Sequence, residues 1–160
     1  MRTKPMRWSR VAVLVMGLMS LLAACTLPES GMDDPKGRLT EYINKSFAVE
    51  SPSDRAALLS YMTGESRARL AAWSEDQFRQ AFIDSKRQKI KFAVTEIKSI
   101  SANEVSLTYE VSYLDQTKSK GAKVTNKKLC SMVKEDGHWL IRDVKNIKEL
   151  VEFKDEAAMP

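Results

Sequence analysis

Residues 105–113 read Val-Ser-Leu-Thr-Tyr-Glu-Val-Ser-Tyr, with a large apolar or aromatic side chain at every second position. The positions between them carry Ser106, Thr108, Glu110 and Ser112. Because successive side chains of a strand point to opposite faces of a sheet, this alternation predicts a strand with one apolar and one polar face. The apolar face must be covered, so the stretch predicts a sheet packed against a second layer.

A strand is also predicted before this stretch, from residue 89 onward. Its apolar positions alternate with polar or small ones and are Ile90, Phe92 and Val94. The alternation then slips by one residue before Ile97, which favours a bulge near Glu96 that bends the strand. Residues 101–103, Ser-Ala-Asn, predict the turn into the next strand.

Two further strands are predicted after it, at residues 123–135 and 138–145. Asp136-Gly137 between them is a residue pair favoured in two-residue hairpin turns. Trp139 and Ile141 share one face of the last strand. Residues 147–153 fit either a continuation of that strand or a short helix, and the pattern alone leaves both open.

Ahead of the strands, apolar residues recur at helical spacing. The predicted helices cover residues 34–49, 51–64, 66–73 and 74–85. Asp34 is a favoured N-cap residue before Pro35, and Gly64 suits the C-terminal end of the second helix. Ser74 and Gln77 have the spacing of a capping box, which predicts the start of the last helix.

The N-terminal segment has the pattern of a secretory signal peptide. Arg2, Lys4, Arg7 and Arg10 precede fourteen largely apolar residues, 11–24, and no acidic residue occurs before Cys25. Fourteen residues at about 1.5 Å each span roughly 21 Å, which is short of the roughly 30 Å hydrocarbon core of a bilayer. The pattern therefore favours a cleaved signal over a transmembrane helix.

The end of this segment, Leu22-Ala23-Ala24-Cys25, resembles the lipobox of bacterial lipoproteins. The resemblance implies cleavage after residue 24 and a diacylglyceryl group, with palmitate-type chains, on the Cys25 thiol. In lipoproteins of enteric-type bacteria an Asp after the cysteine retains the protein in the inner membrane. Thr26 occupies that place here, which implies the outer membrane, facing the periplasm. Residues 25–33 are the expected lipidated cysteine and tether, and residues 34–160 the expected single domain.

Charge and cysteine content narrow the possible functions. The expected cleavage removes four of the 26 basic residues and none of the 21 acidic ones, which leaves a net charge of +1. This balance gives no support for nucleic-acid binding. Cys130 is left as an unpaired thiol, so no internal disulfide is expected. Two cysteines and one histidine, His138, exclude a multi-cysteine zinc site, and no metal or cofactor is expected.

The order of the predicted elements is helices, a bent strand, two long strands and a closing hairpin that contains Asp136-Gly137-His138-Trp139-Leu140-Ile141. Over residues 34–150 this order resembles the nuclear transport factor 2-like superfamily. The resemblance implies an α+β fold in which N-terminal helices pack on a curved four-stranded antiparallel sheet that forms a cone. A cystatin-like or other helix-on-sheet arrangement also fits the pattern.

The interior of such a cone is the first candidate site. The residues expected to line it are Phe92, Tyr109, Tyr113, Trp139 and Asp143. The resemblance implies that an enzyme of this type uses a carboxylate or histidine with a tyrosine, and Asp143, on the Trp139 face, is the candidate base. The sequence identifies no second acidic or basic partner, so no catalytic residue is predicted and the protein is expected not to be an enzyme.

A run of lysines without an acidic residue is the second candidate site. It consists of Lys118, Lys120, Lys123, Lys127 and Lys128. Beside a membrane, such a patch is suited to anionic headgroups or to an envelope protein partner. A solvated row of lysines that protects a sheet edge explains the same residues.

These observations lead to an expected function and two alternatives. The first expectation is a lipid-anchored, non-enzymatic accessory or scaffold protein of the bacterial envelope, in contact with the membrane and with a protein partner. The alternative is a binder of a small apolar ligand in the cone. An isomerase-like enzyme ranks last.

Overall fold

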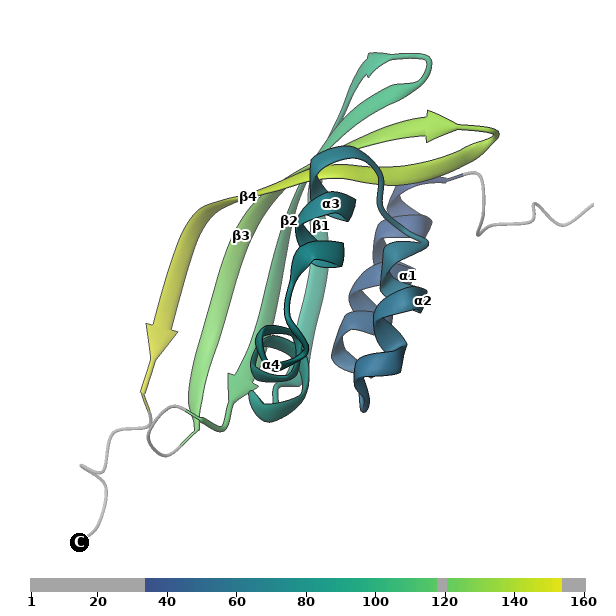
Figure 1. The fold of residues 1–160 in the computed structure, drawn as a ribbon. Helices are drawn as coiled ribbons and strands as arrows, with labels where there is room; N and C mark the ends of the chain where they lie inside the picture. The colour runs from purple at the N-terminus through teal and green to yellow at the C-terminus, as the bar shows by residue number, and fades with distance from the viewer. Residues whose placement is uncertain (1–33, 118–120, 154–160) are drawn as a thin grey trace, which may run out of the picture.

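Four long antiparallel strands form one open sheet in the order of the sequence, and the helices lie against a single face of it (Figure 1). The computed structural model describes residues 34–117 and 121–153. The strands are β1 (Gln88–Ser101), β2 (Glu104–Asp115), β3 (Ala122–Glu135) and β4 (His138–Glu152). The expected α+β class and antiparallel sheet are confirmed. The nuclear transport factor 2-like cone stays a prediction, and the expected signal peptide, Cys25 and tether lie outside the described residues.

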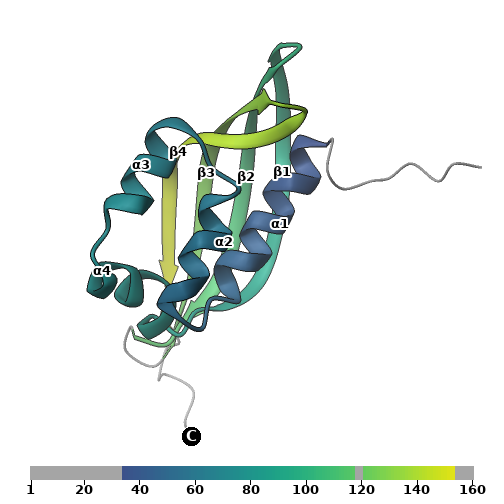
Figure 2. The same ribbon diagram turned by 45° about the vertical axis from the view of Figure 1, so that its right-hand side comes forward.

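The helical layer consists of short elements. They are α1 (Pro35–Phe47), a 3-10 turn (Pro52–Asp54), α2 (Arg55–Leu59), α3 (Gly64–Ala72), α4 (Glu75–Arg79) and a π-helical turn (Gln80–Asp84). Figure 2 shows α1 and α2 side by side, with α3 and α4 toward the β4 side of the sheet. The segment between α2 and α3 pairs with β4: Thr63 N donates to Ile141 O at 2.9 Å, and Ile141 N donates to Tyr61 O at 2.8 Å.

Local capping chemistry explains where the helices begin. The Asp34 carboxylate accepts from Gly37 N at 2.9 Å and begins α1 as predicted. The Ser74 capping box is also confirmed, and it begins α4. The role expected of Gly64 is wrong, because α2 already ends at Leu59 and Gly64 is the first residue of α3. Its φ of +54° is a backbone conformation that favours glycine.

Bulges make β1 less regular than its partner. The residue steps Lys89/Lys91 and Val94/Glu96 both shift the register against β2, so the bulge predicted near Glu96 is confirmed. The first shift leaves Ile90 unpaired and 51% exposed, which corrects its expected place beside Phe92 on the apolar face. The β1–β2 hairpin also extends past the helical layer (Figures 1 and 2).

The last hairpin explains the course of the C-terminal strand. Asp136 and Gly137 have φ angles of +49° and +83°, and the two residues make the tight turn that the sequence predicts. Beyond it, β4 runs to Glu152, so of the two possibilities for residues 147–153 the strand is the one formed. A register shift at Arg142, which pairs with no β3 residue, changes the alternation of β4 after Ile141.

The core lies between the helices and the inner face of the sheet. Its fully buried side chains come from both layers and are Leu39, Leu58, Phe78, Leu107, Cys130, Met132 and Ile141. Leu107 of β2 pairs directly with Cys130 of β3, so the predicted central strand forms the middle of this core. The core does not fill the whole space between the layers, and the part left open is the candidate site.

Candidate ligand-binding cavity

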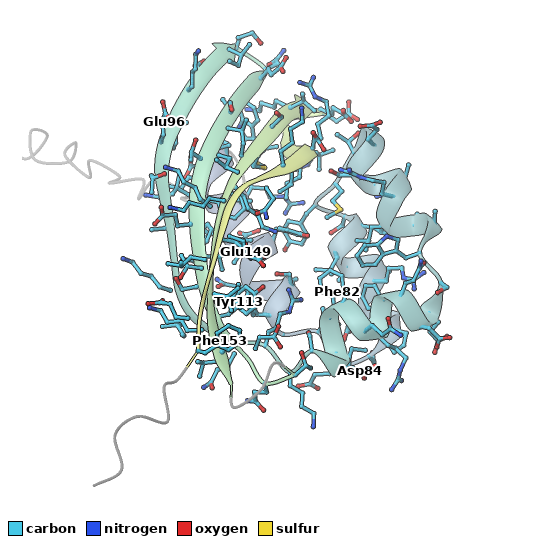
Figure 3. The ribbon with its side chains drawn as sticks, turned by 90° about the vertical axis from the view of Figure 1, so that its left-hand side faces the viewer. Phe82, Asp84, Glu96, Tyr113, Glu149 and Phe153 are labelled. Carbon is cyan, nitrogen blue, oxygen red and sulfur yellow. The ribbon has the colours of Figure 1, made fainter. Side chains whose placement is uncertain are left out.

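A cavity of about 420 Å³ lies between the helical layer and strands β2–β4. This volume is within the range of pockets that bind small molecules. Its lining comes from α1, α3, the π-helical turn, strands β2–β4 and the connections between elements. It comprises Tyr42, Ile43, Ser46, Phe47, Met62, Ser66, Arg69, Leu70, Trp73, Ala81, Phe82, Arg87, Tyr109, Val111, Tyr113, Asn126, Lys128 and Val144. Figure 3 shows Tyr113 on the sheet and Phe82 on the helical layer.

Aromatic side chains form much of the helical wall. The Phe82 ring, on the π-helical turn, lies 4.8 Å from the ring of Phe78 and 6.1 Å from that of Trp73. At the other side, the ring of Phe47 packs 5.7 Å from that of Tyr113. These rings already contact one another, which fixes their positions around the open volume. The wall is therefore apolar and suited to the body of an organic molecule.

Polar groups are concentrated on the sheet side. Asn126 of β3 is only 5% exposed, and its Nδ2 donates to the Tyr113 hydroxyl at 3.3 Å. Its Oδ1 has no hydrogen-bond partner among the described residues. Leaving a buried amide oxygen unpaired is energetically costly, by about 1–3 kcal/mol. Asn126 therefore presents an unused polar atom at the wall of the cavity.

Two cationic side chains lie beside this amide. Lys128 follows Asn126 by two residues on β3, so both face inward, and Arg87 precedes β1. The Arg87 guanidinium lies 5.3 Å from the ring centre of Phe47 and 5.6 Å from that of Tyr113. Burial, followed by repulsion from Arg87, lowers the pKa of the Lys128 ammonium group, and Glu149 partly offsets this shift.

The tyrosines at the wall stay neutral near pH 7. Burial is the main cause of the raised pKa of Tyr42, which reaches about 12. Burial likewise raises the pKa of Tyr109 and of Tyr113. These hydroxyls are hydrogen-bonding groups, and the apolar surroundings oppose their ionisation.

The structure brings together only part of the lining predicted from the sequence. Tyr109 and Tyr113 line the cavity. Trp139 lies in the core, and the partly buried Phe92 packs against the core, with its ring 5.6 Å from that of Tyr109. Asp143 is displaced from the face of Ile141 by the bulge at Arg142 and pairs with Ser131. Its Oδ1 lies 2.8 Å from Arg69 Nη2, outside the cavity lining. No geometry joins it to Tyr109 or Tyr113 as a catalytic pair.

The predicted lysine patch is divided between two faces. Lys127 pairs with Glu110 and Lys148 on the outer face of β3, while Lys128 faces the cavity, because adjacent residues of a strand point in opposite directions. Lys123 forms an ion pair with Glu152 at 2.8 Å. The idea of one continuous patch is thus corrected for these three lysines, and Lys118 and Lys120 lie outside the described residues.

The other two residues considered from the sequence, Cys130 and His138, lie in ordinary structural surroundings. Cys130 is fully buried, and burial raises the pKa of its thiol to about 12, as expected of a structural rather than a reactive cysteine. His138 is exposed at the start of β4.

Residues 34–117 and 121–153 contain no cluster of three or more potential metal-ligating side chains of the His, Cys, Asp or Glu type. In the same residues, no helix is both long and apolar enough to cross a bilayer.

Comparisons with known proteins show a distant structural likeness. No protein-family model matches the chain, and no curated protein matches it in sequence. Among solved structures, the chain is similar to the intermembrane-space region of the chloroplast protein ARC6, with a TM-score of 0.44 and 12% sequence identity. The likeness covers 69% of this chain and 92% of that one.

Proposed function

We propose that this protein is a lipid-anchored, non-enzymatic binding protein of the bacterial envelope, whose folded domain holds a small, largely apolar molecule. The observation that carries the proposal is the cavity of about 420 Å³ with aromatic walls. It favours ligand binding over the scaffold role that the sequence alone placed first, since a protein with only a scaffold role does not need a cavity of this size.

The anchor belongs to the same proposal. Cleavage before Cys25 would leave a short tether between the acylated cysteine and α1, which begins at Pro35. Two acyl chains hold a protein far more firmly than the single chain that binds reversibly. The domain would then stay close to the bilayer, where apolar molecules are concentrated. An outer-membrane location, facing the periplasm, is proposed from Thr26. An envelope protein is the proposed donor or acceptor of the ligand, and a pull-down from the envelope tests for this partner.

The absence of a catalytic role is proposed from the geometry of the polar groups. Asp143, the candidate base, is held by Arg69 at the β4 edge and does not line the cavity. The buried tyrosines have raised pKa values and keep their protons. General acid–base catalysis requires a proton donor or acceptor within reach of the bound molecule. The described lining contains no carboxylate or histidine, and we propose its lysine and tyrosines as binding groups.

A cavity-filling substitution tests this function. Ala81 lines the cavity, whereas Ala71 is exposed on α3. The full chain, held in a peptide-based nanodisc with empty discs as background, is titrated with the neutral fluorophore N-phenyl-1-naphthylamine. Probe emission is excited through tryptophan, because Trp73 lies in the cavity wall.

The expected result is saturable energy transfer to the bound probe in the wild type and in Ala71→Phe. Ala81→Phe should weaken binding about tenfold or more, since its ring occupies the volume that the probe needs. Equal binding by all three proteins, or no saturable binding by any of them, contradicts the proposal.

A further inference from the structure

The charges inside the cavity are unbalanced. Its lining contains three cationic residues, Arg69, Arg87 and Lys128, and no carboxylate. Arg69 is neutralised by Asp143, whose Oδ1 lies 2.8 Å from Arg69 Nη2. For Arg87 and Lys128, the described residues provide no ion pair. Two positive charges therefore border a largely apolar volume without a matching anion.

The surroundings of Lys128 make this arrangement costly in the free protein. The side chain is half-buried on the inner face of β3, and both burial and Arg87 disfavour its charged form. Glu149, which pairs with Asn126 in the sheet, favours the charged form, but it is exposed and lies outside the lining. A buried charge is normally retained only with a partner. An anion bound in the cavity would supply one.

The Asn126 amide is a second, independent indication of a ligand. It is buried beside Lys128 on the same face of β3, and one end of it has no hydrogen-bond partner among the described residues. Exchanging the amide oxygen and nitrogen does not remove this feature, because only one end reaches the Tyr113 hydroxyl. Native proteins rarely leave such a group unsatisfied. The free end of the amide is therefore available to a polar group of a bound molecule.

We propose that the ligand is an amphipathic organic anion, whose carboxylate, phosphate or similar head group is bound by Lys128 and Arg87. This inference rests on the proposed function and specifies its ligand class. The apolar body lies against Phe47 and Phe82, and a polar group next to the anion meets the free end of the Asn126 amide. Lys128 and Arg87 thus select for the charge, while the aromatic wall supplies the larger, less selective part of the contact.

Two probes that share an aromatic body test the role of the charge. N-phenyl-1-naphthylamine is neutral, and 8-anilino-1-naphthalenesulfonate carries a sulfonate on the same ring system. Both are titrated against the full chain in nanodiscs as wild type, Lys128→Gln and the matched control Lys127→Gln. Lys127 is the neighbouring residue on the outer face of β3, so its substitution makes the same change in net charge away from the cavity.

We expect Lys128→Gln to weaken sulfonate binding about tenfold, the usual scale for a lost contact to a charged group, and to weaken binding of the neutral probe much less. Lys127→Gln should match the wild type with both probes, and Lys128→Arg should retain sulfonate binding. If Lys128→Gln binds both probes like the wild type, the charge inference is overturned while the proposed function holds. If neither probe binds the wild type, the proposed function itself fails.

Competition identifies the chemistry of the head group. Decanoate, decyl phosphate, decanol and inorganic phosphate are each used to displace the bound sulfonate probe. Displacement by decanoate or decyl phosphate, at concentrations where decanol has no effect, supports the inference, and the stronger competitor indicates a carboxylate or a phosphate. Displacement by decanol alone, or by inorganic phosphate as readily as by decyl phosphate, overturns it.

Discussion

At the scale of single residues, the two-residue period of a strand has clear consequences. Val105 and Leu107 of β2 are buried, as their alternation predicts, and Cys130 of β3 is buried opposite Leu107. The same rule separates Lys127 from Lys128, although the two are adjacent in the sequence. A residue's neighbours along the chain therefore say less about its function than its parity within the strand.

The buried thiol of Cys130 gives a prediction about stability and pH. Its pKa rises from 9.0 to about 12 in the folded protein, mainly through burial. Since the folded state then holds the proton more tightly than the unfolded state, this contribution to stability is complete below pH 9 and is lost as the pH rises from 9 toward 12.

Urea unfolding of the wild type and Cys130→Ala at pH 8 and at pH 10.5 isolates this contribution. The stability advantage of the wild type should fall by roughly 1 kcal/mol or more between the two pH values. An advantage that is constant or grows with pH would show that the thiol is not held in its neutral form.

Asp143 shows where prediction at this scale fails. Counting by twos from Trp139 and Ile141 places Asp143 on the inner face, but the bulge at Arg142 breaks the count. The sequence does carry a sign of this bulge, because the next apolar residue after Ile141 is Val144, a slip of one residue like the one before Ile97. The carboxylate consequently pairs with Arg69 at the sheet edge, and the expected base is not part of the cavity.

At the scale of helices and strands, local signals were sufficient where capping or turn chemistry is strong. Asp34, Ser74 and the Asp136-Gly137 pair each mark a boundary that the structure contains. The role expected of Gly64 is wrong because its positive φ suits the end of one helix and the turn into the next equally well. The residue type alone therefore does not show which of the two it marks.

The capping box of α4 yields a stability prediction. Ser74 Oγ accepts from Gln77 N at 3.1 Å, and Gln77 Oε1 accepts from Ser74 N at 2.8 Å. Replacing Ser74 with alanine should lower the free energy of unfolding by about 1 kcal/mol, as measured by urea denaturation. Ser74→Asp keeps a capping oxygen and should lose much less. Equal losses in the two variants would mean that the cap does not stabilise α4.

At the scale of the whole molecule, the antiparallel α+β fold was predictable because each strand and helix carries its own pattern. The cavity was not. Its lining joins Tyr42 of α1, Arg87 before β1 and Lys128 of β3, which are far apart in the sequence. Whether helices fill the space above a sheet depends on how side chains from all of them pack together, and no local pattern records that volume.

The charge of the cavity depends both on strand alternation and on the folded arrangement of the chain. Lys128 could have been assigned to the inner face from the alternation of Asn126, Lys128 and Cys130, given a sheet register. Arg87 could not, because it lies in the short connection before β1 and reaches the cavity only through the folded arrangement. Most residues that line the cavity are apolar, and its positive charge arises because folding brings Arg87 next to Lys128.

The most direct test of the central claim is the mass of the full protein purified from its own envelope, measured under native and under denaturing conditions. The denatured wild type should have the mass of a chain that begins at Cys25 and carries acyl groups. The native protein should be heavier by one small organic molecule, which is absent from Ala81→Phe and retained in Ala71→Phe. A native mass equal to the denatured mass in the wild type would contradict the claim that the cavity holds a ligand.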